Sequence, residues 1–196
     1  MRCVITGSAG FIASHVAEKL VGEGHTVKVY DDLSTGKKKN LATVRDQVSF
    51  WESSILDIGM LKCACRDADV IVHAAARTSV PESEVKPQLY DLINTQGTRC
   101  VVMAAEKMGV KRLVFLSSCS VYGGREGEAK ETHPLIPRNV YSRTKLEGEE
   151  IVKAANLDTV TLRLFNVYGP RQREGGYAGV ISKWLQAALE GKPCII

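Results

Sequence analysis

The sequence predicts an α/β protein built on a doubly wound parallel sheet with helices on both faces. Two observations support this fold: apolar runs rich in Val and Ile alternate with segments of helical period, and a glycine-rich turn follows the first apolar run. Continuous apolar runs are typical of parallel strands that are buried on both faces. Their alternation with helices predicts right-handed crossovers and ligand binding beyond the carboxyl ends of the strands.

Strands and helices are expected in turn along the chain. The apolar runs that predict strands are residues 1–6, 26–30, 70–73, 113–116 and 159–164. The segments in which apolar residues recur at helical spacing are residues 11–22, 89–108, 142–155 and 178–190. The predicted loops, which hold much of the glycine, proline and charge, are residues 33–40, 78–87 and 123–139.

The length of 196 residues suits one domain, or one domain and the beginning of a second. A boundary is predicted after Gly169 and Pro170, because the glycine-rich residues 171–179 interrupt the regular alternation. We therefore expect a first domain over residues 1–170 and the start of another part over residues 171–196.

Composition narrows the setting in which the protein works. The formal charge is +4 without a basic tail or stripe, so we expect no nucleic-acid partner. The six cysteines are scattered in a chain too large to need disulfides, which predicts reduced thiols and a cytoplasmic location. Cys63 and Cys65 lack a second pair at zinc spacing, so no metal is expected. No apolar run approaches the ~18 residues of a membrane helix, so no membrane association is expected.

A glycine-rich turn joins the first predicted strand to the first predicted helix. Gly7 permits the tight turn, Gly10 lets the backbone approach a phosphate, and Ala13 stands where a third glycine would ease helix packing. Backbone N–H groups and the positive end of the helix face this point, so a pyrophosphate is the natural ligand. Glycine turns also occur where nothing binds, so the neighbouring residues must decide.

Asp31 strengthens the prediction of a dinucleotide site. It ends the second strand about 20 residues after the glycines, where a carboxylate can accept both ribose hydroxyls and repel a 2′-phosphate. The sequence therefore favours NAD over NADP. The basic run of residues 37–39 could reach a phosphate, although a solvated loop is the simpler interpretation.

Tyr141 and Lys145 are candidates for proton transfer. They are four residues apart on a predicted helix, so both side chains lie on one face. A tyrosine titrates near pKa ~10, and a neighbouring ammonium is expected to lower that pKa by stabilising the phenolate. Tyr141 could then exchange a proton with a substrate hydroxyl while hydride moves to or from a nicotinamide. Such a pair alone is usually only a helix surface pair.

Further motifs carry a resemblance to a known family. The serine-rich residues 117–120 follow an apolar run and precede Val121-Tyr122-Gly123. Together with the glycine turn and the Tyr-Lys pair, the motifs are Asp31, Asp57, His73-Ala74-Ala75, Asn94 and Arg163-Leu164-Phe165-Asn166. Over its whole length the chain resembles the extended short-chain dehydrogenase/reductase family of nucleotide-sugar epimerases and dehydratases, and it is most similar to the UDP-glucose 4-epimerases. The resemblance implies a Rossmann fold.

The resemblance also implies roles for individual residues. The implied catalytic set is Ser118, which would bond the reacting sugar hydroxyl, Tyr141 as the base, and Lys145, which would also hold the nicotinamide ribose. The positions implied to contact the cofactor are Gly7, Gly10, Phe11, Ile12, Asp31, Asp57, Ile58, Ala74, Ala75, Ala76, Tyr141 and Lys145. Those implied on the substrate side are Ser118, Tyr141, Phe165 and Asn166, with Asn94 as a structural residue behind the site. His73 and Cys119 receive no role, because a packed histidine and a small thiol are the simpler interpretations.

The resemblance implies NAD-dependent 4-epimerisation of a UDP-hexose through a 4-keto intermediate, by a homodimer. Cys119 and Ser120 stand where the family's dehydratases carry an acidic pair, which disfavours a 4,6-dehydratase or a uronate decarboxylase without excluding either. Family members are longer, and their carboxyl-terminal part closes over the sugar nucleotide. We therefore expect a Rossmann domain truncated before most of the substrate domain, and a non-catalytic NAD-binding protein of the same fold stays an alternative.

Overall fold

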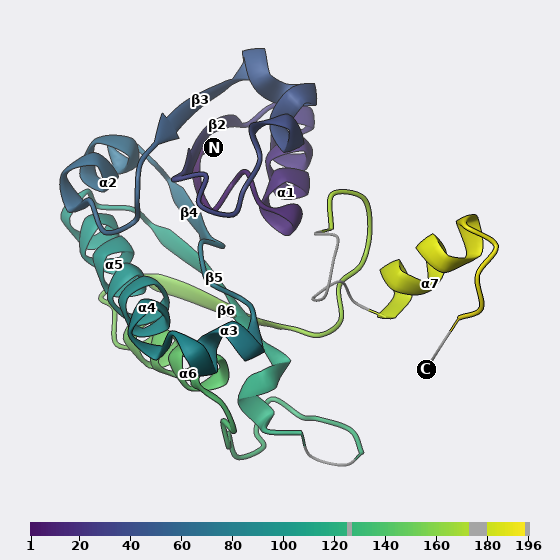
Figure 1. Cartoon of the computed structure of the whole chain (residues 1–196). Coiled ribbons are helices and arrows are strands. Elements are labelled where there is room, and N and C mark those ends of the chain that lie inside the picture. The colour runs from purple at the N-terminus through teal and green to yellow at the C-terminus, as the bar shows by residue number, and fades with distance from the viewer. Residues whose placement is uncertain (125–126, 173–179, 195–196) are drawn as a thin grey trace.

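The computed structural model describes residues 1–124, 127–172 and 180–194, and its centre is one parallel sheet (Figure 1). The six strands lie in the order β3-β2-β1-β4-β5-β6. They are β1 (Arg2–Thr6), β2 (Thr26–Asp31), β3 (Val48–Glu52), β4 (Val70–His73), β5 (Arg112–Ser118) and β6 (Asp158–Leu164). The strand order reverses between β1 and β4, which is the doubly wound arrangement that the sequence predicts. Ligands of such sheets bind beyond the carboxyl ends of the strands at this reversal.

Helical segments connect the strands. The α-helices are α1 (Phe11–Gly22), α2 (Ile58–Cys65), α3 (Val80–Val85), α4 (Pro87–Tyr90), α5 (Gly97–Lys107), α6 (Val140–Lys153) and α7 (Val180–Leu189). Tighter or wider turns form the 3-10 helices η1 (Lys38–Gln47) and η3 (Cys119–Tyr122) and the π-helix η2 (Asp91–Gln96). Within the described ranges, no helix combines the length and the apolar composition that crossing a bilayer requires.

Helices cover the two faces of the sheet in separate clusters. In β1 the adjacent residues Val4 and Ile5 are both fully buried but belong to different clusters, because neighbouring side chains of a strand point to opposite faces. Ile5 packs with α1, whose buried Ala13 and Ala17 let the helix approach the sheet closely. Val4 belongs to the larger cluster with α2, α5 and α6. Figure 1 shows these three helices on the opposite side of the sheet from α1.

The structure differs from the sequence-based prediction at several elements. β3 and α2 were not predicted, since the run Val48–Glu52 is short and only alternately apolar. The single helix predicted over residues 89–108 is divided, because a π-helical turn separates α4 from α5. The loop predicted over residues 78–87 contains α3, and β5 extends to Ser118. The predicted helix 178–190 corresponds to α7, except that residues 178–179 lie outside the described ranges.

The last strand is the least covered one. In β6, Val160 is 37% exposed and Leu162 is 42% exposed. In Figure 1, α7 stands apart from the sheet rather than over this strand. One edge of the fold therefore keeps apolar side chains in contact with solvent.

Candidate functional site

The turn after β1 has the geometry that a phosphate requires. Gly7 adopts a φ of +69°, and its N–H donates to the carbonyl oxygen of Tyr30 at 2.8 Å. A Cβ on Gly7 would lie 2.6 Å from the backbone N and Cα atoms of Ala75, so only glycine fits. Gly10 precedes α1 with an extended backbone, and among the described residues no side chain caps this helix end. The first N–H groups of α1 are thus left for another partner.

Ser8 provides an independent sign of a ligand at this turn. The residue is completely buried, and its Oγ atom has no hydrogen-bond partner among the described residues. Buried hydroxyl groups in native proteins are almost always hydrogen-bonded. A bound ligand with polar oxygens at the turn would give the Ser8 hydroxyl the hydrogen-bond partner that it lacks.

Asp31 is positioned at the end of β2, as the sequence predicts, and its carboxylate is tightly held. Its Oδ2 atom accepts a hydrogen bond from the N–H of Ala9 at 2.9 Å, and Oδ1 accepts one from the N–H of Leu33 at 2.8 Å. Burial raises the pKa of this carboxyl, and the two N–H groups oppose that rise. A carboxylate has about four acceptor positions, so two hydroxyl donors could still be accommodated.

The other predicted cofactor positions follow β3 and β4. Asp57 caps α2, since its Oδ1 atom accepts a hydrogen bond from the N–H of Met60 at 3.0 Å, and Ile58 is the first residue of that helix. A half-buried turn follows β4 directly and consists of Ala74, Ala75 and Ala76. The N–H of Ala74 donates to the carbonyl of Thr6 at 3.2 Å, so this turn lies against the glycine turn.

The side chains of Phe11 and Ile12 lie on a different side of α1. Both line an open groove of about 500 Å³ between α1 and residues 167–170. Arg171 holds this segment to α1, where it forms an ion pair with Glu18 and donates a hydrogen bond to Ser14 at 3.2 Å. Phe11 and Ile12 could therefore serve the predicted pyrophosphate site through their backbone N–H groups at the start of α1, but not through their side chains.

Ser118, Tyr141 and Lys145 are brought together from two elements. Ser118 ends β5, and its Oγ atom accepts a hydrogen bond from the N–H of Ser120 at 3.2 Å. Tyr141 and Lys145 lie one turn apart in α6, and the Ser118 hydroxyl lies near enough to the Tyr141 phenol to oppose the rise of its pKa. The Lys145 ammonium donates to the carbonyl of Leu116 and lies 4.3 Å from the ring centroid of Phe115.

The electrostatics of this cluster differ from the expectation that Lys145 lowers the pKa of Tyr141. Burial raises the pKa of the Tyr141 phenol, and the Ser118 hydroxyl opposes the rise. Burial also lowers the pKa of Lys145 to about 7, while the negative charge of Glu149 opposes that change. The reason for the difference is that the ammonium is directed to Leu116 and Phe115 rather than to the phenol oxygen.

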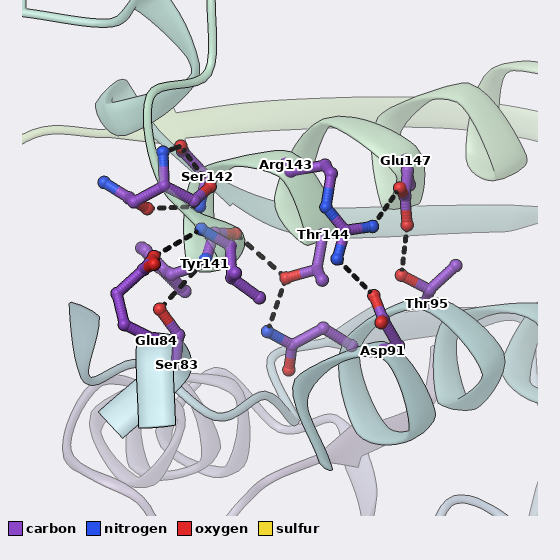
Figure 2. A network of polar contacts seen from close by, with 12 residues as sticks. Ser83, Glu84, Asp91, Thr95, Tyr141, Ser142, Arg143, Thr144 and Glu147 are labelled. Carbon is purple, nitrogen blue, oxygen red and sulfur yellow. Dashed lines mark hydrogen bonds and ion pairs between the residues drawn. The ribbon is translucent and has the colours of Figure 1, made fainter. Parts of the chain in front are cut away.

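Helix α3 holds the first turn of α6 (Figure 2). The N–H of Tyr141 donates to Ser83 Oγ at 3.2 Å, and the N–H of Val140 donates to Glu84 Oε1 at 2.9 Å. Helix α3 follows the 74–76 turn closely in the chain. The segment of residues 74–85 therefore reaches from the predicted cofactor site to the predicted base, Tyr141. Sequence reasoning missed these contacts, since Ser83 and Glu84 lie in an apparent loop.

The outer side of α6 is also fixed (Figure 2). Arg143 forms ion pairs with Asp91 at 2.7 Å and with Glu147 at 2.6 Å, and Thr95 donates a hydrogen bond to Glu147 at 2.7 Å. These contacts tie α6 to the π-helix η2. The position of Tyr141 is therefore set by side chains from two other helical segments.

A buried ion pair links α6 to β6. Glu149 accepts hydrogen bonds from Ser117 Oγ at 2.5 Å and from Arg163 Nη2 at 2.8 Å. Arg163 also donates to the hydroxyl of Tyr122 at 2.9 Å. Phe165 and Asn166 follow on the exposed end of this strand, with Phe165 61% exposed and its ring 6.4 Å from that of Tyr122. No spacing signal in the sequence marked Glu149.

Comparison with known proteins gives consistent relatives. The UDP-glucose 4-epimerase of Thermus thermophilus, solved as a complex with NAD, is 37% identical with a TM-score of 0.89 over 98% of this chain and 64% of that one. DesIV of Streptomyces venezuelae, a dTDP-glucose 4,6-dehydratase solved with NAD, is 31% identical with a TM-score of 0.89 over 97% of this chain and 63% of that one. A UDP-N-acetyl-alpha-D-glucosaminuronate decarboxylase of Bacillus cytotoxicus is 35% identical over 204 residues. That match covers 100% of this chain and 63% of the relative, so the chain spans less than two thirds of the curated protein.

The family model of the NAD dependent epimerase/dehydratase family matches residues 3–196. The cofactor of this family is NAD, and the residues present fit it. Gly7 leaves room that a Cβ would fill, Ser8 holds an unpartnered buried hydroxyl, and Asp31 presents its carboxylate at the next strand end. By fold, by motif and by sequence over nearly its whole length, the chain belongs to the NAD dependent epimerase/dehydratase family.

Proposed function

We propose that the chain serves NAD-dependent 4-epimerisation of a nucleotide sugar, with a UDP-hexose as the substrate. The observation that carries the proposal is the meeting of Ser118, Tyr141 and Lys145 at the carboxyl end of β5. Two of the three similar proteins described above act on UDP-linked sugars by name, which supports the choice of nucleotide.

The side chains have separate tasks in the proposed reaction. NAD, when bound, supplies a reversible acceptor for the hydride of the sugar. Tyr141 takes the proton of the sugar hydroxyl at its phenol oxygen and later returns it. Ser118 orients that hydroxyl through its own hydrogen bond, with Phe165 and Asn166 on the substrate side. Holding the reacting groups in place in this way accounts for a large part of enzymatic rate enhancement.

Lys145 must act on Tyr141 for this chemistry to run near neutral pH. The buried phenol has a raised pKa, and a neutral phenol cannot accept a proton. A turn of the Lys145 side chain away from the Leu116 carbonyl would bring a positive charge toward Tyr141. We therefore assign Lys145 two tasks, stabilising the phenolate and binding the nicotinamide ribose.

The surroundings of Ser118 favour epimerisation over dehydration. Dehydration of the sugar needs an additional acid and base, and the next two residues are Cys119 and Ser120. A thiol and an unactivated hydroxyl are poor substitutes for carboxylates. The buried carboxylate of Glu149 is bonded to Ser117 and Arg163, so it is committed to structure. A 4,6-dehydratase or uronate decarboxylase is the alternative that this observation disfavours.

A labelling experiment tests the chemistry. The protein is incubated with NAD and a panel of UDP-, dTDP- and GDP-sugars in deuterated water, and products are identified by mass and sugar stereochemistry. Return of the hydride predicts inversion at C4 and no deuterium at C5 or C6. Deuterium at those carbons or loss of water indicates the dehydratase branch. NAD binding without turnover of any sugar, both by this chain and by a version extended to the length of its relatives, indicates a non-catalytic protein.

The proposal extends to assembly and location. Leu92 in η2 and Met103 in α5 are 45% and 49% exposed on consecutive helical segments, which supports a homodimer through this surface. Light scattering tests the homodimer: the wild-type chain should have the mass of a dimer and Met103→Glu that of a monomer. A wild-type chain with the mass of a monomer contradicts the proposal.

The six cysteines are free, which supports a reducing, cytoplasmic location. The dispersed charge of +4 supports a partner set without nucleic acid.

A further inference from the structure

His73 is a buried imidazole at the end of β4, between the cofactor turn and the catalytic helix. It is 1% exposed, and both ring nitrogens have partners. The Nδ1 atom lies 2.7 Å from Thr6 Oγ1, and the Nε2 atom lies 3.0 Å from Thr98 Oγ1. Both nitrogens of a buried neutral imidazole need a partner, and here the two partners lie on different elements, Thr6 in β1 and Thr98 in α5.

The neighbouring groups fix where the proton of the ring lies. Thr98 donates its only hydroxyl proton to the carbonyl of Asn94 at 2.5 Å, so toward His73 it can only accept. The Nε2 atom must therefore carry the proton, and Nδ1 accepts from the hydroxyl of Thr6. Burial, and next the charge of Lys145, lower the pKa of His73 to about 3, so the ring is neutral at physiological pH.

One route from this ring leads to Tyr141. Asn94, which receives the Thr98 hydroxyl at its carbonyl, donates from its side-chain amide to Thr144 Oγ1 at 3.1 Å. Thr144 in turn donates to the backbone carbonyl of Tyr141 at 2.9 Å. The hydrogen bonds thus continue from the end of β4 through η2 and α5 into the first turn of α6, the region shown in Figure 2.

A second route leads to Lys145. The ring of His73 lies 5.5 Å from the ring of Phe115, and the ammonium of Lys145 lies 4.3 Å from the centroid of the same Phe115 ring. Gly148 permits this approach, because a Cβ there would lie 2.7 Å from Phe115 Cζ. One imidazole is therefore connected both to the backbone carbonyl of Tyr141 and to the ammonium of Lys145 in α6.

The other end of the connection is the cofactor turn. The hydroxyl of Thr6, which bonds His73, also accepts from the N–H of Ala75 at 3.4 Å, and Ala75 is the residue against which Gly7 packs. We propose that His73 is a positioning residue that couples the dinucleotide turn to Tyr141 and Lys145, through Thr6 on one side and Thr98 and Asn94 on the other. This inference rests on the proposed function, because it concerns the same site.

Isosteric changes at Thr98 test the coupling without emptying the core. Thr98→Val removes the hydroxyl and keeps the shape, whereas Thr98→Ser keeps the hydroxyl. NAD affinity of the chain should fall about fivefold in Thr98→Val, the effect of one net hydrogen bond, and return within about twofold of wild type in Thr98→Ser. The matched control is Thr43→Val, which removes a hydroxyl bonded to Glu18 where η1 packs on α1. Equal affinity losses in Thr98→Val and Thr43→Val would overturn the proposal.

A double-mutant cycle separates positioning from general destabilisation. Lys145→Met removes the group proposed to bind the nicotinamide ribose. If Thr98 acts through α6, Thr98→Val should cause little further loss of NAD affinity in the Lys145→Met background. Additive losses would show that the hydroxyl of Thr98 acts independently of Lys145, against the proposal.

A cofactor-free measurement keeps this test apart from the proposed function. If the wild-type chain binds no NAD, the proposed function fails, and amide hydrogen exchange of residues 141–145 then decides about His73. Faster exchange of these amides in Thr98→Val than in Thr98→Ser and Thr43→Val, at equal global stability, supports the coupling. Unchanged exchange would contradict it.

Discussion

The cofactor edge, by which we mean the carboxyl ends of the interior strands β1 and β2, and the β6 edge, which is the last strand of the sheet and the residues directly after it, differ in how completely the described residues surround them. At the cofactor edge Asp31 is 7% exposed and bonded to two backbone N–H groups, and Ser8 is fully buried. At the other edge Leu162 is 42% and Phe165 61% exposed. Parallel strands are normally covered on both faces. The comparison teaches that the proposed NAD side of the site is built from contacts within this chain, whereas the proposed sugar side, at Phe165 and Asn166, is exposed to solvent. We therefore expect NAD binding to be stronger here than sugar orientation.

The sharpest way to break this comparison is to remove the proposed base. Tyr141→Phe keeps the packed ring but removes the proton acceptor, so we expect turnover of the sugar to fall by about 10²–10⁴-fold, the usual contribution of acid–base catalysis. NAD affinity should fall by no more than about fivefold, because one neutral hydrogen bond is the most that is lost. Steady-state kinetics and NAD titration measure the two effects. Near-normal turnover of Tyr141→Phe would assign the base to another residue.

Matched leucines on neighbouring strands measure the difference in cover directly. Leu113 in β5 is 0% exposed and Leu162 in β6 is 42% exposed. Leu113→Ala should lower the free energy of unfolding by about 2–5 kcal/mol, as large-to-small changes in a core do. Leu162→Ala should lower the free energy of unfolding by less than about 1 kcal/mol, because folding removes less apolar area from water at that position. Urea denaturation compares them, and equal losses would mean that the β6 face is covered in solution.

The cofactor edge itself is tested at Asp31. Asp31→Ala should weaken NAD binding by about 10- to 100-fold, the cost of losing hydrogen bonds to a charged acceptor, and should narrow the preference for NAD over NADP. The control is Asp32→Ala, whose carboxylate bonds only the N–H of Ser34 in its own exposed turn. Calorimetric titration with both cofactors provides the numbers. A larger effect at Asp32, or a wild-type chain that prefers NADP, would move the ribose site away from Asp31.

The pH dependence of stability tests the burial of Lys145. Its pKa is lowered to about 7 from an ordinary value of 10.5, so between these pH values the unfolded chain binds more protons than the native one. The free energy of unfolding should therefore rise through Lys145 by up to about 1.4 kcal/mol per pH unit between pH 7 and 10.5. This gain is lost as the pH falls back to about 7. Urea unfolding of wild type and Lys145→Met at pH 7, 8 and 9 measures this rise. The exposed Lys153→Met on the same helix is the control, and parallel pH profiles of all three would exclude a desolvated ammonium.

Much of the fold was predictable because its signals are local. The buried strands β1, β2 and β4 are mostly apolar runs, and the helix α1 has a clear apolar period, so the sequence indicated them within a few residues. The helix α6 was also predicted within two residues at each end, although its buried face is mostly polar. β3 is an edge strand with mixed residues, and the π-helical turn at Asn94 arises from buried side-chain contacts rather than from spacing. These two elements therefore appeared only in the structure.

The sequence alone determined which residues are available for chemistry: a glycine turn before a helix, an acidic residue at the next strand end, and a Tyr-Lys pair after a serine-rich strand end. The tertiary structure decided how those residues are held and in which state. Whether Lys145 lies on Phe115 or on Tyr141, and which nitrogen of His73 carries the proton, depends on partners that are far apart in the chain, such as Thr6 and Thr98. Burial and hydrogen bonding set these states, and both are properties of three-dimensional packing that residue spacing does not encode.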